Sequence, residues 1–131
     1  MKTELTLEQS AKLIELGVDA SLASKCQVQH EADFEVETKI VPHDEFCYEM
    51  ASLNPQPIFT LTDILTILPK EVIYNRVSEN LTIFIDNNKS TATYPFYNSN
   101  DADFESPELI DSLYQLLIWT ITNGYLNQKK K

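Results

Sequence analysis

The chain contains very little glycine. Only two of its 131 residues are glycine, Gly17 and Gly124, and each follows an apolar stretch with helical periodicity. Glycine-rich phosphate loops, dinucleotide-binding fingerprints and nucleophile elbows all need glycine where the backbone approaches a ligand or turns under strain. The sequence lacks these motifs, and their absence excludes most nucleotide-dependent enzymes.

Basic residues are scarce as well. Ten lysine and arginine residues stand against twenty aspartate and glutamate residues, which gives a formal net charge of -10 at pH 7. A field of this sign repels the phosphates of nucleic acids and the surface of anionic membranes. We therefore expect no direct binding to nucleic acid or membrane. The negative charge favours a protein partner that is basic or that itself binds nucleic acid. The sequence leaves the oligomeric state open.

Long apolar runs are missing too. No stretch approaches the roughly 18 apolar residues that cross a bilayer, and the segment MKTELTLEQSAK lacks the apolar core of a secretory signal. We therefore expect a cytoplasmic protein with reduced cysteines. The length fits a single α+β domain over residues 1–131, in which residues 126–131 form a frayed basic tail.

Capping residues predict three helices. Thr6 and Gln9 form a capping box before an apolar stripe that Gly17 ends, and Thr60 with Asp63 repeats the arrangement before a short central helix. For the third and longest helix, Ser106 is the expected N-cap, Pro107 the first helical residue and Gly124 the residue that ends it. This last helix is apolar over a wide face and is expected to be mostly buried.

Alternating patterns predict the strands. Residues 33–41 alternate between an apolar face that includes Ile40 and a charged face, and residues 71–77, 81–86 and 91–97 are further candidates. Asn87 and Asn88 suit a hairpin turn with positive φ, and Pro95 favours an edge strand. The expected fold class is α+β: a three- or four-stranded antiparallel meander packed against a long C-terminal helix, with shorter N-terminal and central helices.

Two groups of acidic residues are candidate interaction surfaces. The first lies on the charged face of the strand at 33–41, and the second precedes the last helix. They comprise Glu31, Asp33, Glu35 and Glu37 in the first group and Asp101, Asp103 and Glu105 in the second. Such groups are either solvated faces or binding surfaces for a basic partner, including surfaces that mimic the charge of nucleic acid.

The segment CQVQHEADFEVETKIVPHDEFC holds both cysteines and both histidines of the chain. Cys26 with His30 and His43 with Cys47 form two mixed pairs that resemble zinc-finger spacing in outline. A strand between the pairs argues against zinc, so we expect no cofactor, and a zinc-binding interaction module is the alternative. A small thiol enzyme or hydrolase built on the same residues is a third hypothesis.

Aromatic residues gather around the strand at 91–97. The group comprises Tyr74, Phe84, Tyr94, Phe96 and Tyr97. An exposed stacking platform for single-stranded nucleic acid is one interpretation, but such platforms carry positive charge. The acidic surroundings favour core packing or a protein interface.

Two stretches carry a resemblance. FTLTDILTILPKEV at 59–72 and SPELIDSLYQLLIWTITNGYL at 106–126 resemble a group of small uncharacterised acidic proteins of phages and mobile elements from anaerobic gut bacteria. The opening LTLEQSAKLIELGVDAS is similar in character. The resemblance covers about half of the chain, consists of structural signatures and transfers no catalytic residue. It implies a non-enzymatic accessory or regulatory protein that acts by protein–protein interaction.

Overall fold

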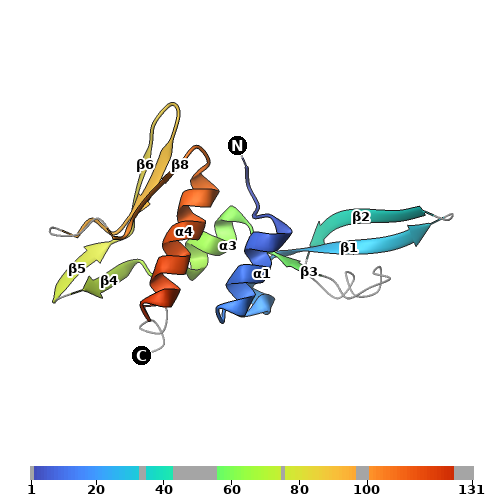
Figure 1. Ribbon diagram of the computed structural model, residues 1–131, viewed down its shortest axis with the longest axis horizontal. Helices are drawn as coiled ribbons and strands as arrows, with labels where there is room; N and C mark the ends of the chain where they lie inside the picture. Colours follow the sequence, from blue (N-terminus) through green and yellow to red (C-terminus); the bar gives the residue numbers. More distant parts are fainter. Residues whose placement is uncertain (1, 33–34, 43–55, 75, 97–100, 126–131) are drawn as a thin grey trace. The chain divides into compact units, whose positions relative to one another are not determined.

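The computed structural model groups the chain into two compact units, which are described separately (Figure 1). The amino-terminal unit is Glu4–Asp63, and the carboxy-terminal unit joins Met1–Thr3 to Ile64–Lys131. The described residues are 2–32, 35–42, 56–74, 76–96 and 101–125. The expected tail at 126–131 lies outside them, and the single domain stays a prediction.

The first helix of the amino-terminal unit, α1 (Leu7–Glu15), has the predicted ends. The Thr6 hydroxyl accepts from the Gln9 amide at 3.1 Å, and the Gln9 side chain accepts from the Thr6 amide at 3.0 Å. After the helix, Gly17 has φ of 108°, and the Val18 amide donates back to the Leu13 carbonyl at 3.0 Å. This is the Schellman closure, and it explains the glycine.

A short turn, η1 (Ala20–Leu22), leads into three strands of one antiparallel sheet. They are β1 (Lys25–Ala32), β2 (Glu35–Pro42) and β3 (Gln56–Ile58), in the order β2-β1-β3. β1 and β2 form a hairpin that extends away from α1 (Figure 1). The strand expected at 33–41 is confirmed as β2, but its partner β1 was not predicted.

The faces of β2 differ from the prediction at its end. Ile40 was expected on the buried face, yet it is 46% exposed. The next residue, Val41, stands opposite Cys26 in the register and packs against Cys26 and Val28, which are both buried. Because opposite residues of an antiparallel pair share a face, the β1 partner decides which β2 face is buried.

Helix α3 (Leu61–Ile67) crosses the boundary between the units and leads into a hairpin of β4 (Glu71–Tyr74) and β5 (Val77–Asn80). The predicted single strand at 71–77 is therefore wrong. The chain reverses near Arg76, which is the only described residue other than glycine with positive φ, at 67°. An arginine gives no sequence signal for a left-handed turn residue.

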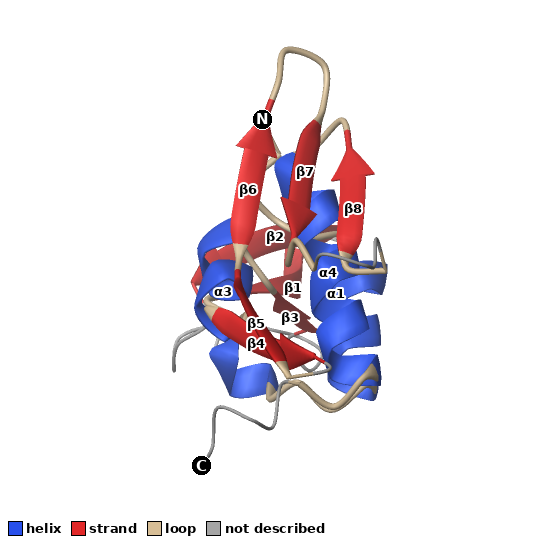
Figure 2. Cartoon of the chain, turned by 90° about the vertical axis from the view of Figure 1, so that its left-hand side faces the viewer, coloured by secondary structure: helices blue, strands red, loops and turns tan. Residues whose placement is uncertain are grey.

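The second sheet of the carboxy-terminal unit is a run of three antiparallel strands, shown side by side in Figure 2. They are β6 (Thr82–Ile85), β7 (Ser90–Thr93) and β8 (Asp103–Ser106), in that order. β7 lies in the middle, so the edge position inferred from Pro95 is wrong, because Pro95 follows the strand. The expected β6–β7 hairpin forms, but neither Asn87 nor Asn88 has positive φ.

Helix α4 (Leu109–Thr122) lies against β7 and β8. It begins later than predicted: Ser106 belongs to β8, and Glu108 occupies the N-cap position. At its other end Gly124 has φ of 79°, and the Tyr125 amide donates to the Thr120 carbonyl at 2.8 Å. The buried apolar residues of α4 are Leu109, Ile110, Leu113, Leu116 and Leu117. The α+β class, antiparallel sheets and C-terminal helix are confirmed.

Candidate functional site

The cysteine–histidine pair of β1 does not form a metal site. Cys26 is fully buried, and its thiol lies 4.0 Å from the Pro42 carbonyl oxygen. His30 stands four positions further along the same extended strand, opposite Glu37. At about 3.3 Å per residue the two Cα atoms are about 13 Å apart. Zinc bonds of about 2.0–2.3 Å cannot close that distance.

The other half of the predicted metal set, His43 and Cys47, lies outside the described residues. Within the described part of the chain, no group of three or more histidine, cysteine, aspartate or glutamate residues is placed to hold a metal ion. Cys26 also lacks the solvent access that a reactive thiolate needs. Cys26 is thus a small core residue, and the thiol-enzyme hypothesis loses one of its two nucleophiles.

The first acidic group is divided by the hairpin. Glu31 lies on β1, whereas Glu35 and Glu37 lie on β2, and Asp33 is outside the described residues. Glu31 stands opposite Val36 in the register. The expected single strand for this group is therefore wrong, because Glu31 belongs to β1 and Glu35 and Glu37 belong to β2.

The second acidic group is held on a strand that the sequence did not reveal. Asp103 and Glu105 are exposed on β8, on either side of the half-buried Phe104, and Asp101 is exposed just before the strand. Phe104 lines an open apolar groove of about 420 Å³ with residues of α4, among them Ile118 and Trp119. Asp103 and Glu105 therefore face away from α4.

The register aligns these acids with the rest of the sheet. Glu105 stands opposite Thr91, which stands opposite Phe84, and Phe84 is 59% exposed. The Glu105 carboxylate lies 3.3 Å from the Lys89 ammonium, and both side chains are about half exposed. The face of the sheet away from α4 therefore carries acids on β8 and an apolar residue on β6.

The aromatic group is divided: Tyr94 and Phe96 lie in the core, whereas Phe84 on β6 is 59% exposed. Tyr94 and Phe96 are buried, and their rings lie 6.3 and 6.5 Å from that of Trp119. Trp119 also stacks on Tyr125 at 5.1 Å. Burial raises the pKa of Tyr94, whose hydroxyl donates to the Pro69 carbonyl. Core packing is confirmed for Tyr94 and Phe96, while the Tyr97 and Tyr74 side chains lie outside the described part.

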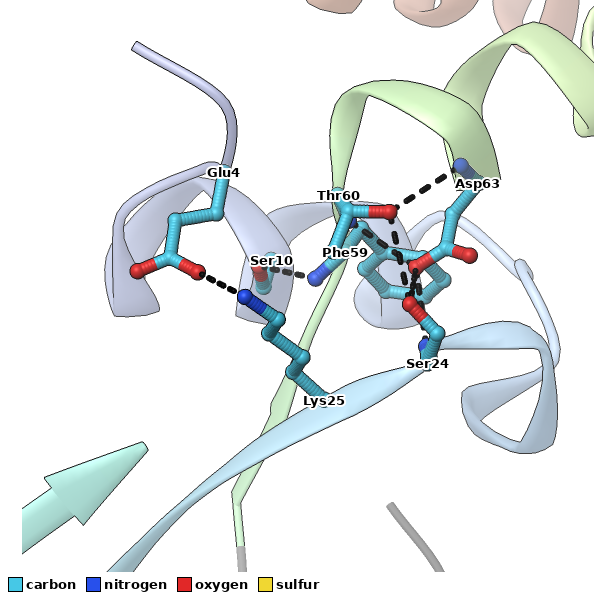
Figure 3. Close-up of polar contacts among 7 residues, drawn as sticks. All are labelled: Glu4, Ser10, Ser24, Lys25, Phe59, Thr60 and Asp63. Atoms are coloured by element: carbon cyan, nitrogen blue, oxygen red, sulfur yellow. Dashed lines mark hydrogen bonds and ion pairs between the residues drawn. The ribbon is translucent and has the colours of Figure 1, made fainter. Parts of the chain in front are cut away.

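A polar network in the amino-terminal unit surrounds the start of α3 (Figure 3). Thr60 and Asp63 form the predicted capping box: the Asp63 amide donates to the Thr60 hydroxyl at 3.2 Å, and the Thr60 amide donates to the Asp63 carboxylate at 2.9 Å. The same carboxylate oxygen accepts from the Ser24 amide at 2.8 Å and from the Ser24 hydroxyl at 2.9 Å. The sequence did not predict the Ser24 contact, because Ser24 lies 39 residues before Asp63.

Two further contacts in Figure 3 extend this network. The buried Ser10 hydroxyl of α1 accepts from the Phe59 amide at 3.1 Å. Lys25 at the start of β1 lies 3.4 Å from the Glu4 carboxylate. The hydroxyls of Ser10 and Thr60 and the carboxylate of Asp63 thus accept from backbone amides, and the carboxylate of Glu4 pairs with the Lys25 ammonium. These contacts involve α1, the start of β1, the two residues after β3 and α3, and their chemistry is that of helix capping and strand connection.

Comparisons with known proteins add no assignment: no family model matches the chain, and neither curated proteins nor solved structures give a significant match. Across the described residues, no helix is both long and apolar enough to span a membrane.

Proposed function

We propose that the chain is a non-enzymatic accessory or regulatory protein that binds a basic protein partner through the carboxylates of β8. The resemblance to phage and mobile-element proteins suggests the setting. The single observation that carries the proposal is the placement of Asp103 and Glu105, both exposed, on one face of a paired strand.

The strand gives these carboxylates a fixed spacing. Residues two apart on a strand lie about 7 Å from each other and point the same way. Pairing with β7 and packing of α4 against β7 and β8 hold the backbone of β8 in place. A surface that is fixed before binding loses little conformational entropy on association.

The charge of the chain supports a basic partner. Asp101, Asp103 and Glu105 fall within five residues, and the net charge is -10. Charged groups at the rim of an interface mainly raise the association rate and select against partners of like charge. In a partner that itself binds nucleic acid, the basic surface would bind these carboxylates in place of phosphates. The chain would then mimic the charge of nucleic acid.

The test starts with affinity purification from the native host and continues with the purified partner. The double variant D103N/E105Q is compared with E8Q/E15Q, which removes two exposed charges from α1 and changes the net charge equally. We expect D103N/E105Q to slow association about five- to tenfold at 50 mM salt, and E8Q/E15Q to change it less than twofold. Equal rates for the two variants would contradict the β8 surface.

A second measurement separates charge mimicry from ordinary binding. If the partner binds DNA, the chain should displace a fluorescent duplex from it, and D103N/E105Q should displace less at the same concentration. Raising the salt from 50 to 500 mM should weaken the complex strongly. A complex that resists salt would refute a charge-driven mechanism.

A further inference from the structure

Strand β6 is an edge strand of the second sheet, and no other described strand pairs with its outer side. In the order β6-β7-β8 it pairs with β7 on one side only. Its sequence, TIFI, contains no charged residue, and Phe84 and Ile85 are 59% and 65% exposed. Natural proteins usually protect an edge strand with charges, proline or a bulge, because unprotected edges pair with other strands. The described part of β6 has neither charge nor proline.

The register shows which backbone groups of β6 are available. The Asp86 amide donates to the Lys89 carbonyl at 2.9 Å, so Asp86 and Lys89 are a hydrogen-bonded pair of the hairpin. Such pairs alternate along an antiparallel ladder, so Phe84 and Thr82 also bond toward β7. The amide and carbonyl groups of Ile83 and Ile85 therefore point outward from the free edge.

At its other end the edge is already occupied. The Leu81 amide donates to the Lys70 carbonyl at 2.8 Å, which continues the β4–β5 ladder. The outward hydrogen-bonding groups of β6 are thus limited to Ile83 and Ile85, and Phe84 lies between them. This short segment is symmetric about Phe84.

We propose that β6 pairs with β6 of a second copy of this chain, antiparallel and across a two-fold axis at Phe84. Ile83 of each copy then stands opposite Ile85 of the other and exchanges two hydrogen bonds with it. The two Phe84 side chains stand directly opposite in the intervening pair, where cross-strand side chains lie closest. In this register every outward backbone group of β6 forms a hydrogen bond. Its two most exposed apolar side chains, Phe84 and Ile85, are covered by the second copy at the same time.

Neighbouring registers fit less well. A pairing centred on Ile83 places Leu81 opposite Ile85 of the second copy, but the Leu81 amide is already bonded to Lys70. A pairing centred on Ile85 places Phe84 opposite Asp86 of the second copy, which leaves the aromatic ring against a carboxylate. The pairing centred on Phe84 instead places Asp86 opposite Thr82 and avoids both conflicts.

The acidity of the chain does not oppose this pairing. β6 itself carries no charge, and the acids Asp103 and Glu105 lie on β8, at the far edge of the sheet. In the paired sheet the two β8 strands are separated by five strand spacings, about 24 Å. This exceeds the screening length of about 8 Å at physiological salt, so repulsion between the two acidic strands is largely screened.

The contact is small, and the affinity follows from its size. The apolar surface that pairing removes from water comes mainly from Phe84 and Ile85 of the two copies. The total area buried by so few residues falls below the roughly 1,200 Å² typical of stable complexes. We therefore expect a reversible dimer with a dissociation constant of about 10–100 μM. Sedimentation equilibrium of the full chain from 5 to 500 μM should show the mass rise from 15.0 kDa toward twice that value.

Two cysteine variants test the register. In F84C the introduced thiols face each other across the two-fold axis, with Cα atoms about 4.5 Å apart, within the range of a disulfide. In I85C they stand about 8–9 Å apart, beyond that range, although Ile85 is the more exposed of the two. Under mild oxidation we expect F84C to form a cross-linked dimer at least fivefold faster than I85C, with peptide mapping placing the disulfide at position 84.

Amide hydrogen exchange of the unmodified chain gives an independent readout. Raising the concentration should protect the Ile83 and Ile85 amides, while the Phe84 amide, already bonded to β7, should not change. A chain that stays monomeric at 500 μM, or cross-linking that is equal in F84C and I85C, would overturn the proposal. Protection of Ile83 and Ile85 that appears only with a purified host protein would assign the edge to that protein and also overturn it.

Discussion

Replacing Asp63 with alanine should destabilise the amino-terminal unit more than its exposure suggests. One oxygen of this carboxylate accepts three hydrogen bonds, from the Thr60 amide and from the amide and hydroxyl of Ser24. Hydrogen bonds to charged groups contribute about 1.5–3 kcal/mol when buried. Because this site is only partly buried, we count about 0.5–1 kcal/mol for each, or about 2 kcal/mol for D63A.

Graded variants separate the contributions. D63N keeps the acceptor oxygen but loses its charge, so we expect a loss of about 1 kcal/mol. S24A keeps the Ser24 amide bond but removes the hydroxyl, which donates to Asp63 at 2.9 Å and lies 3.3 Å from the Thr60 hydroxyl, and should lose about 0.5 kcal/mol. The control is E15A, since Glu15 is exposed and its ion pair with Lys12, at 3.9 Å, contributes almost nothing.

Urea unfolding followed by far-ultraviolet circular dichroism measures these free energies, and amide exchange at Ser24 and Thr60 locates the effect. Both amides should exchange faster in D63A, because each loses its acceptor. A D63A free energy of unfolding within 0.5 kcal/mol of the unmodified chain would refute the reasoning. So would an S24A loss as large as that of D63A, because the carboxylate would then contribute nothing beyond one hydroxyl bond.

Two further predictions concern Tyr94 and zinc. Burial raises the pKa of Tyr94 above its ordinary value of about 10, so its stabilisation is complete below pH 10 and is lost as the pH rises through the folded-state pKa. Y94F should lose about 1 kcal/mol at pH 7 and depend less on pH from 10 to 11.5 than the unmodified chain; parallel pH profiles in urea titrations would contradict this. For zinc, native mass spectrometry should give the metal-free mass of 15.0 kDa, and EDTA should leave the thermal melt unchanged. A stoichiometric zinc adduct would restore the metal hypothesis.

Local signals in the sequence predicted the helices well. The capping box at Thr6 and the glycines after α1 and α4 act within one or two turns, so the residues that form these ends are close in sequence. The start of α4 was missed by two residues, because Ser106 pairs with Ser90 in the sheet. A non-local pairing displaced a strong local capping signal.

Strands were predicted less well for the same physical reason. β1 and β8 are polar at alternate positions, and their pairing with β2 and β3 and with β7, respectively, establishes them as strands. Adjacent apolar residues such as Ile40 and Val41 give no clear face until the partner strand is known. The acids of β8 were identified correctly as residues, but their fixed alignment along a strand required the structure.

Trp119 has a spectroscopic consequence. It is the only tryptophan of the chain, lies in the carboxy-terminal unit and stacks on Tyr125 beside Tyr94 and Phe96. Tryptophan fluorescence, excited where tyrosine absorbs little, therefore reports on that unit alone, because the amino-terminal unit contains no tryptophan. If the Trp119 emission and the peptide circular dichroism change at different denaturant concentrations, the chain unfolds in two steps. Trp119 is thus a natural probe for this measurement.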